Sequence, residues 1–447
     1  MSAVQDSSRQ ASTRVKVPGR TRNMVVIGGS MTVDGGDNTV VAGLFPAIQL
    51  ALGLSYGALG LLTSTARLVG VVAGPLWVWI ARRTSRKAVL AVATGFWGLW
   101  SAAAGLSQDF WQLLVLYTVA AAGSAAGQAL VPEIIGDSYD EHLRGRAVGI
   151  LMGCVAAFSA LAAPLVGLLA EVDDGWRYGF LIAGLLNALF GVVILVFYKD
   201  PGSGAAEHQL ADLDAGTRAR MATVTWDKVR SLLRIRSFLV LLASRLLSTH
   251  MLVQVFGVVL LVDVYGMSNS VAVLALAATG LGYLGGTLLG GAVSDWVQRL
   301  SPLRGRIALL QVVQVVFAVL AYFGTQFDWG GIGLFAVWFA AMGAVQGMNP
   351  GVNRPLVMSV VTPELRGAAF AIYVAVVESI GFAAYTLLAG VLADAFGLQT
   401  ALLWLCVGLM ALNGLLLGLA YKPYARDVAA VQRELDERRE RALAEEA

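Results

Sequence analysis

The sequence predicts an all-α membrane protein that crosses the bilayer twelve times, in two pseudo-symmetric bundles of six helices. Composition is the first reason: 57% of the 447 residues are hydrophobic and only 14% are charged, whereas a soluble domain carries about 25% charged residues. The second reason is a series of twelve apolar windows long enough to span a membrane. The third is that the positive charges alternate with these windows.

Each window is as long as a spanning helix requires. The hydrocarbon core is about 30 Å thick and a helix rises 1.5 Å per residue, so about 20 mostly apolar residues are needed. Strands of a β-barrel would be about 10 residues long with strict alternation, which these windows lack. The windows are 24–50, 58–81, 88–107, 111–133, 147–170, 178–198, 237–262, 270–294, 307–325, 331–352, 368–393 and 399–421.

The positive charges test this count. With the N-terminus in the cytoplasm, all of the 32 Lys and Arg residues fall in cytoplasmic segments except Arg67, Arg177 and Arg245. This is the positive-inside pattern, and a missed span would invert it. We therefore expect a multi-pass protein of the plasma membrane with both termini in the cytoplasm.

The windows divide the chain into five parts, and a repeat relates the halves. The motif Leu-Arg-Gly occurs at 143–145 and again at 365–367, 222 residues later, at equivalent places in the two halves, as expected of a membrane protein built from internal repeats. The glycine-rich run 280–291 (GLGYLGGTLLGG) is typical of close helix packing in lipid. The expected parts are a cytoplasmic tail (1–23), an N-terminal six-helix bundle (24–198), a cytoplasmic linker (199–236), a C-terminal six-helix bundle (237–421) and a charged helical tail (422–447).

Several function classes are excluded or disfavoured. The chain has no Gly-Lys pair, so it lacks the phosphate-binding loop of an ATPase. Its three histidines are far apart and its two cysteines lie in apolar runs, so we expect no metal site, no disulfide framework and no cofactor. The formal net charge of +3 argues against nucleic acid as a partner. An enzyme built on Asp34, Asp37 and His250 is a remote alternative.

Ionisable residues inside the spans are the main functional candidates, because a charge at membrane depth is costly and usually marks function. Asp34, Asp37, Arg67, Arg245 and Glu378 lie about 12 to 20 Å from the predicted helix starts, at 1.5 Å per residue. Two acids three residues apart do not both stay ionised cheaply in a low-dielectric site. We therefore expect Asp34 or Asp37 to carry a proton, with Arg67 or Arg245 as its partner. Glu378 is the alternative proton site.

Polar residues in and beside spans one, seven and ten complete the predicted cavity. Asn38 lies four residues after Asp34, on the same helix face. His250 titrates near physiological pH, although a lone histidine on an apolar helix is often only hydrogen-bonded. The Asn-Pro-Gly run at 349–351 is expected to break or kink span ten. The remaining members are Gln254, Gln346 and Asn349, with Asn353 beside them.

The basic cytoplasmic loops predict a gate. Arginines there would pair with acids on neighbouring helix ends and so hold one state of the protein; the alternative is that they only enforce orientation. The predicted gate residues are Arg83, Arg86, Glu133, Asp137, Arg144, Asp295 and Arg366.

These motifs resemble those of the major facilitator superfamily over essentially the whole spanning region. Residues 290–295 (GGAVSD) and 83–87 (RTSRK) resemble the two copies of its cytoplasmic loop motif, and 176–180 (WRYGF) resembles a common start of span six. There are departures: Arg82 stands where the first loop motif is acidic, Val119 where span four often has arginine, and only Pro164 and Gly167 remain of an antiporter signature. A closer similarity, to spinster-like members, rests on residues 41–49 (VAGLFPAIQ), 85–87 (SRK) and 132–137 (PEIIGD).

The resemblance implies alternating access around a central site between two bundles, and no enzymatic activity. The expected function is proton-coupled secondary transport of a small organic or amphiphilic solute, with the proton gradient as energy source and the protein as a monomer. Two cations at depth, Arg67 and Arg245, favour an anionic or zwitterionic solute, although Asp34 and Asp37 could equally supply their anionic partner. The spinster-like similarity implies a lysolipid-like or other amphiphilic solute. The alternatives are a proton-driven exporter of cationic or hydrophobic drugs and a non-transporting sensor with the same fold.

Overall fold

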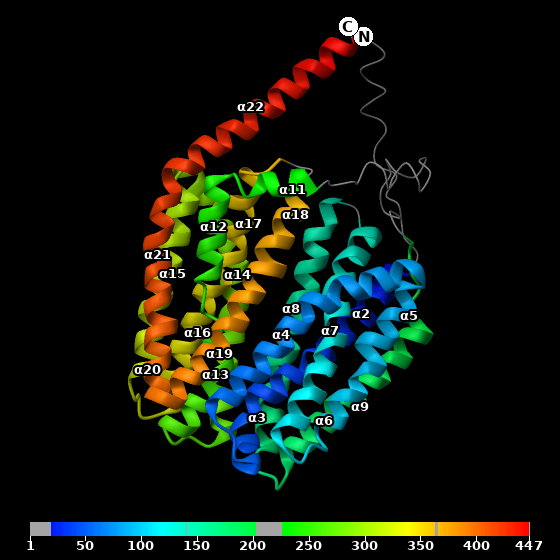
Figure 1. Ribbon diagram of the computed structural model, residues 1–447, viewed down its shortest axis with the longest axis vertical. Helices are drawn as coiled ribbons and strands as arrows, with labels where there is room; N and C mark the ends of the chain where they lie inside the picture. The colour runs from blue at the N-terminus through cyan, green and yellow to red at the C-terminus, as the bar shows by residue number, and fades with distance from the viewer. Residues whose placement is uncertain (1–18, 140, 203–225, 363–364, 447) are drawn as a thin grey trace.

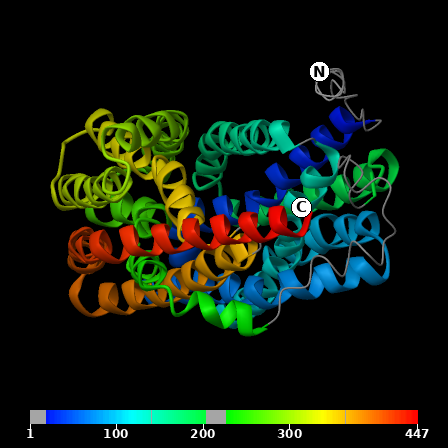
Figure 2. The ribbon, with the colours of Figure 1, turned by 90° about the horizontal axis from the view of Figure 1, so that it is seen from above.

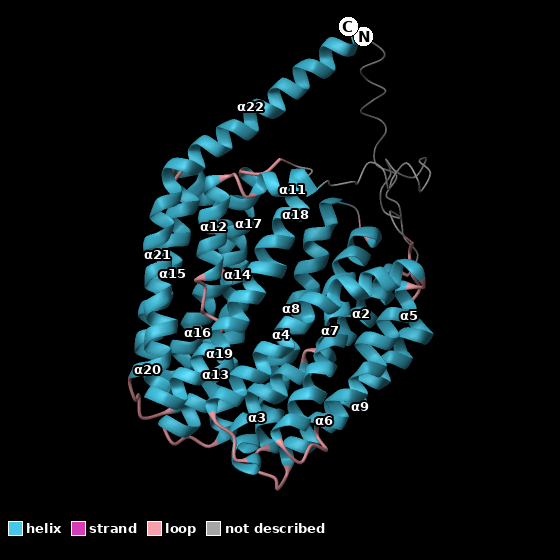
Figure 3. Cartoon of the chain, viewed as in Figure 1, coloured by secondary structure: helices cyan, strands magenta, loops and turns pink. Residues whose placement is uncertain are grey.

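The described part of the chain is helical from end to end (Figure 1). The computed structural model describes residues 19–139, 141–202, 226–362 and 365–446. Helices and short loops account for all of these residues, and no strand occurs among them (Figure 3). The helices form two groups that lie side by side when seen along the long axis (Figure 2).

The first group, here called the N-bundle, contains the helices before residue 199. Its elements are α2 (Arg20–Asp34), α3 (Gly36–Leu52), α4 (Tyr56–Arg83), α5 (Arg86–Leu90), the π-helical turn η1 (Ala91–Gly95), the 3₁₀ turn η2 (Phe96–Gly98), α6 (Leu99–Ala104), α7 (Phe110–Ser138), α8 (Glu141–Leu169) and α9 (Gly175–Phe197).

The second group, the C-bundle, follows the short helix α11 (Trp226–Leu232) and ends at residue 420. Its elements are α12 (Arg236–Leu246), α13 (Leu252–Val259), η4 (Leu260–Val264), α14 (Asn269–Leu300), α15 (Gly305–Gln326), α16 (Ile332–Gly347), α17 (Asn349–Ser359), α18 (Arg366–Phe370), η6 (Ala371–Glu378), α19 (Ser379–Phe396), α20 (Leu398–Leu402), η7 (Leu403–Gly408), α21 (Leu409–Leu416) and η8 (Leu417–Ala420). Helix α22 (Tyr421–Glu446) then projects beyond the bundle (Figure 1).

All twelve predicted windows fall on helical elements. Nine helices of the described part are long and apolar enough to cross a membrane, and Leu252–Val264 forms a shorter apolar helix. The first window is divided at Gly35, between α2 and α3, and the seventh at residues 247–251, between α12 and α13. The fifth window lies in α8, where several side chains are outside the described residues. The predicted break in span ten is present at Met348, between α16 and α17.

The surface carries many exposed large apolar side chains, among them Leu50, Leu161, Leu288 and Leu415. On a soluble protein such a surface would be an aggregation hazard. On a bundle of spanning helices it is the face that contacts lipid acyl chains.

Glycines let α14 and α16 pack backbone to backbone. A Cβ atom added at Gly286 would lie 1.8 Å from the carbonyl oxygen of Ala344, and one at Gly282 would lie 1.9 Å from that of Ala340. Such a close approach of two helices is possible only with glycine at the crossing. The predicted packing role of the 280–291 run is therefore confirmed for these two positions.

The two bundles meet at the end of the molecule opposite the chain termini, which we call the closed end (Figure 1). There α4 packs against α19, α8 against α14, and α3 against α13 and α14. Beyond Arg67 the glycines of α4 contact α7 of their own bundle instead, since Gly70 and Gly74 lie beside Ala125 and Ala129. The contact along α4 therefore runs from Tyr56 to Arg67.

Candidate functional site

The last contact of this interface is a charged cluster of Glu378, Arg245 and Arg67. Arg245 belongs to the same bundle as Glu378; its Nε donates to Oε2 of Glu378 at 3.1 Å, and its Nη2 forms an ion pair with the same oxygen. Arg67, from the N-bundle, places Nη2 3.6 Å from Oε1 of Glu378. One carboxylate thus contacts a guanidinium from each bundle.

Interrupted helices position the two C-bundle members. Arg245 lies in the last turn of α12, just before the helix stops. Side chains of the break are held by hydrogen bonds: the Thr249 hydroxyl donates to the carbonyl oxygen of Leu405 at 2.7 Å, and the Ser248 hydroxyl is 2.9 Å from Nδ1 of His250. Glu378 ends the π-helical segment η6. π-Helical turns and broken membrane helices both occur preferentially at functional sites.

Aromatic rings enclose the cluster. The guanidinium of Arg245 lies 5.6 Å from the ring centre of the buried Tyr373, and that of Arg67 lies 5.6 Å from the ring of Phe382. The side chains of Arg245 and Glu378 are both 14% exposed, whereas that of Arg67 is 29% exposed. The Nε atom of Arg67 is buried and has no hydrogen-bond partner within the described residues. The cluster therefore holds one more positive than negative charge and a free donor.

The structure places the predicted Asp34 site differently. Asp34 ends α2 beside the break at Gly35. Its Oδ2 lies near Gly127 of α7: a Cβ atom added at Gly127 would be 4.0 Å from it. The side chains of Asp37 and Asn38 are outside the described residues. Arg67 and Arg245 both contact Glu378, the alternative proton site of the sequence analysis; equal depth along two helices does not by itself make their side chains face each other.

The other predicted cavity residues are dispersed. His250 lies in the break between α12 and α13, against the ring of Phe317, and Gln254 is exposed on α13. Gln346 and Asn349 are both buried in the C-bundle, where Asn349 donates to Gln346 at 2.9 Å and accepts from Gln314 at 3.0 Å.

Asn353 is buried as well. Its Oδ1 has no hydrogen-bond partner in the described part of the chain.

The predicted gate residues pair within bundles at the end near the termini. Arg86 contacts Asp137 and Glu133 of α7, and its Nη2 lies 2.6 Å from Asp200 at the start of the linker. Arg86, Glu133 and Asp137 belong to the N-bundle, and Asp200 lies just after its last helix. Arg86 therefore pairs with acids on a neighbouring helix end of its own bundle and with the start of the linker.

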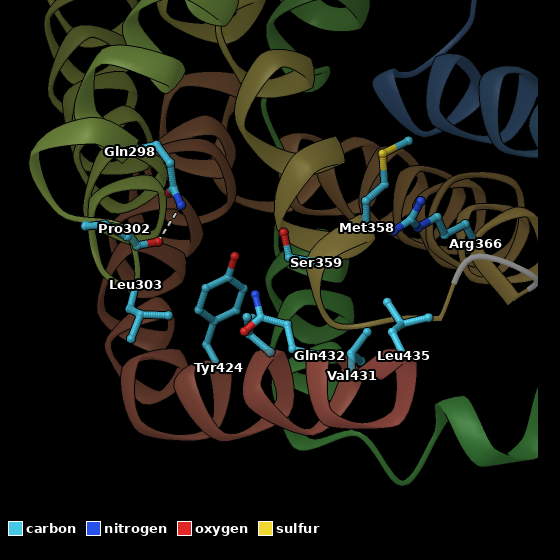
Figure 4. Close-up of a pocket in the computed structure, with 11 residues that line it drawn as sticks. Gln298, Pro302, Leu303, Met358, Ser359, Arg366, Tyr424, Val431, Gln432 and Leu435 are labelled. Atoms are coloured by element: carbon cyan, nitrogen blue, oxygen red, sulfur yellow. Dashed lines mark hydrogen bonds between the residues drawn. The ribbon is translucent and has the colours of Figure 1, made fainter. Parts of the chain in front are cut away.

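The same holds in the C-bundle, where Asp295 pairs with Arg306 at 2.9 Å. Arg83 is exposed, with its guanidinium 4.0 Å from the ring centre of Trp79. The side chain of Arg144 is outside the described residues. Arg366 lines a separate pocket beside α22 (Figure 4).

The contacts of the closed end were not predicted from the sequence. Asp394 of α19 accepts from the backbone N–H groups of Tyr56 and Gly57 at 2.8 and 2.9 Å, which cap the start of α4. The hydroxyl of Tyr56 donates to Asp263 at 3.0 Å. These acids gave no signal because they stand near span ends, where charged residues are ordinary.

Two further polar contacts join the start of α14 to the N-bundle at the same end, one to the turn after α8 and one to α3. Ser270 donates to Glu171 at 2.5 Å, and Asn269 donates to the carbonyl oxygen of Gly43 at 2.8 Å. Between these contacts and the charged cluster, Ser64 donates to the carbonyl oxygen of Ala383 at 2.7 Å. The bundles are thus joined by hydrogen bonds at the closed end and by an ion pair at the inner limit of their contact.

Comparison with known proteins agrees with this architecture. The family model of the Major Facilitator Superfamily matches residues 27–331. A solved bacterial homolog of the human lysosomal transporter Spinster, in an inward-facing and unoccupied conformation, superposes with a TM-score of 0.74 at 19% identity, covering 93% of this chain and 98% of that one.

Curated relatives are matched over shorter stretches. The sphingosine-1-phosphate transporter SPNS2 of Mus musculus is 24% identical over 205 residues, 45% of this chain and 36% of the relative. A probable 4-methylmuconolactone transporter of Cupriavidus pinatubonensis (strain JMP 134 / LMG 1197) is 28% identical over 216 residues, 47% of this chain and 48% of the relative. The match thus spans between a third and a half of these relatives' length. The spinster-like resemblance and the all-helical fold are confirmed, the relatives are transporters and not enzymes, and the chain belongs to the Major Facilitator Superfamily.

Proposed function

We propose that this protein is a proton-coupled secondary transporter of a small organic or amphiphilic anion, and that Glu378 is its proton-carrying residue. The observation that carries the proposal is the ion-pair cluster in which Glu378 joins Arg245 of its own bundle to Arg67 of the other. Because this carboxylate contacts an arginine of each bundle, a relative movement of the bundles changes the positive charge beside it.

The charge of the cluster supports an anionic solute. Two guanidinium groups face one carboxylate, and the unpartnered Nε of Arg67 can donate to a further acceptor. A partly buried cation is stabilised by an anionic partner. A carboxylate or phosphate of the solute would supply this partner.

Coupling follows from the geometry. Arg67 leaves Glu378 when α4 and α19 separate, and the carboxylate then keeps only Arg245. Loss of a nearby positive charge disfavours the ionised form of an acid. Protonation of Glu378 would accompany the opening of the interface, and its deprotonation would accompany closure.

The relatives support the class of solute. One is named for sphingosine-1-phosphate, a phosphate-bearing compound, and another for 4-methylmuconolactone, a small organic molecule. We further propose a monomer in the plasma membrane with cytoplasmic termini. In that orientation the closed end faces outward.

The experiment uses the full chain in proteoliposomes. A thermal-shift screen of organic anions and cations, including sphingosine-1-phosphate and 4-methylmuconolactone, selects a labelled solute. Counterflow exchange and uptake driven by a proton gradient are then measured for the wild type and for Glu378→Gln. We expect the variant to lose gradient-driven accumulation and to keep counterflow, because a permanently neutral residue cannot carry a proton through the cycle.

Asp173→Asn is the matched control, since Asp173 is an exposed acid at a distance from the cluster. It should behave like the wild type in both assays. Undiminished accumulation by the Glu378→Gln protein would refute the assignment of Glu378. Turnover of the solute without exchange would favour an enzyme, and binding without exchange a sensor.

The cationic drug exporter is less well supported. Its cation acceptors would be Asp34, Asp37 and Glu378, and both oxygens of the Glu378 carboxylate already face arginines. A cationic solute would have to displace one of them.

A further inference from the structure

A cavity of about 330 Å³ lies between α22 and the end of the C-bundle near the termini (Figure 4). Its volume is at the lower end of the range for small-molecule sites. The lining comes from α14 and the loop after it, from α17, from the first residue of α18 and from α22, so it is separate from the cluster between the bundles. The lining residues are Gln298, Pro302, Leu303, Met358, Ser359, Arg366, Tyr424, Val428, Val431, Gln432 and Leu435.

Among the described residues the lining carries one charge, that of Arg366, and no acid. The Nε atom of Arg366 is buried without a hydrogen-bond partner among the described residues, and so is Oε1 of Gln298. Two other arginines at this end have acidic partners, Arg86 with Asp137 and Arg306 with Asp295. A buried donor without a partner is costly, and an anionic group in the cavity would satisfy it.

The remainder of the lining is largely apolar. Val428, Val431 and Leu435 follow one face of α22 at helical spacing, and Leu303 and Met358 line the same cavity from the C-bundle. A ligand that suits both parts has one anionic head group and a short apolar body.

We propose that this cavity is a regulatory site for a small amphiphilic anion that holds α22 against the C-bundle. Arg366 binds the anionic group, and the apolar side of α22 covers the chain of the ligand. Because Arg366 begins the helical run α18–η6 that ends at Glu378, an occupied site also restrains the helix that carries the central carboxylate. The site is not the transport site, since the N-bundle contributes nothing to its lining.

A cysteine-protection experiment on the full chain tests the site without any transport assay. Val431→Cys is introduced together with Cys154→Ala, because Cys154 is exposed and Cys406 is buried. The rate of alkylation by N-ethylmaleimide is measured with octyl phosphate as the anionic probe and octanol as its neutral match. We expect octyl phosphate to slow alkylation and octanol to leave it unchanged.

Arg366→Gln should raise the octyl phosphate concentration for half protection by about tenfold or more, as expected for the loss of a charged hydrogen bond. Arg304→Gln is the matched control, because Arg304 is an exposed arginine at the same end that does not line the cavity. Arg245→Gln should also leave protection unchanged, which separates this site from the proposed transport site.

Two further arms complete the test. Val428→Phe fills the cavity and keeps Arg366, so protection should also disappear in this variant if the ligand body lies there. Nanodiscs that contain phosphatidylglycerol are compared with nanodiscs of phosphatidylcholine alone, to test whether a lipid head group supplies the anion. Protection only in the phosphatidylglycerol nanodiscs would also support the anion site. Equal protection by octanol, no protection by either anion, or full protection in the Arg366→Gln protein overturns the proposal.

Discussion

At the scale of single residues, the two arginines beside Glu378 differ in what they contribute to stability. Arg245 makes two contacts with the carboxylate and is largely buried, whereas Arg67 stands 3.6 Å away and is more exposed. Breaking a buried pair leaves an uncompensated charge and costs about 3 kcal/mol. We therefore expect Arg245→Gln to lower the melting temperature in detergent clearly, and Arg67→Gln to cost under about 1 kcal/mol.

The double variant Arg245→Gln with Glu378→Gln provides the control, because it removes both charges of the pair. It should melt above the Arg245→Gln protein. If Arg67→Gln were the more destabilising single change, the arginine of the other bundle would be the principal partner of Glu378.

The sequence identified these three residues but not their contact. A charge inside an apolar window is visible in the sequence, and so is its depth along the helix. The direction in which the side chain points depends on helix rotation and on the π-helical segment before Glu378, and neither leaves a signal in one sequence. Asp34 was therefore assigned the arginines that Glu378 in fact contacts.

At the scale of helices, two adjacent glycines of α14 make opposite predictions. A Cβ at Gly286 would lie 1.8 Å from the carbonyl oxygen of Ala344, whereas one at Gly285 would meet nothing within 4 Å. Overpacking of this kind costs about 3 kcal/mol. Gly286→Ala should lower thermal stability or abolish folding, as judged by size-exclusion chromatography and a melting curve.

Gly285→Ala serves as the matched change, since alanine is intrinsically the better helix former. It should melt at or slightly above the wild-type temperature. Equal effects of the two substitutions would mean that α14 and α16 do not touch at Gly286.

Helix breaks differ in how visible they are in the sequence. The divisions at Gly35 and Met348 stand beside Gly-Gly and Asn-Pro-Gly, which punctuate helices. The break at residues 247–251 contains neither glycine nor proline. It depends on partners from elsewhere in the fold, such as the carbonyl oxygen of Leu405 that accepts from Thr249.

At the scale of the whole molecule, the closed end should control which side of the protein opens. Asp394→Ala removes two hydrogen bonds between the bundles at an exposed place, which we estimate at about 1 kcal/mol, or about fivefold in the ratio of the two states. Spin labels at Arg83→Cys and Arg304→Cys, on exposed positions of opposite bundles, should move closer together in this variant.

Asp173→Ala is an exposed-acid control that should leave the distance distribution unchanged. A distribution that is also unchanged in the Asp394→Ala protein would show that these hydrogen bonds do not hold the closed end together.

The general plan of the molecule was the most predictable level. Window length and the distribution of Lys and Arg reflect constraints that the bilayer places on any chain, so they predicted the all-helical fold without reference to packing. Contacts between bundles, such as Asp394 with the start of α4, depend on the position of one half relative to the other. No local pattern reports that position.

The cap on α4 also has an evolutionary consequence. The carboxylate of Asp394 accepts hydrogen bonds from backbone N–H groups, which every amino acid except proline has. Drift at Tyr56 could alter the hydroxyl contact with Asp263 but would leave the cap in place, and at Gly57 a bulkier residue would act only by crowding the carboxylate. Whether these two hydrogen bonds form therefore depends mainly on the residue encoded at position 394, in the second half of the gene.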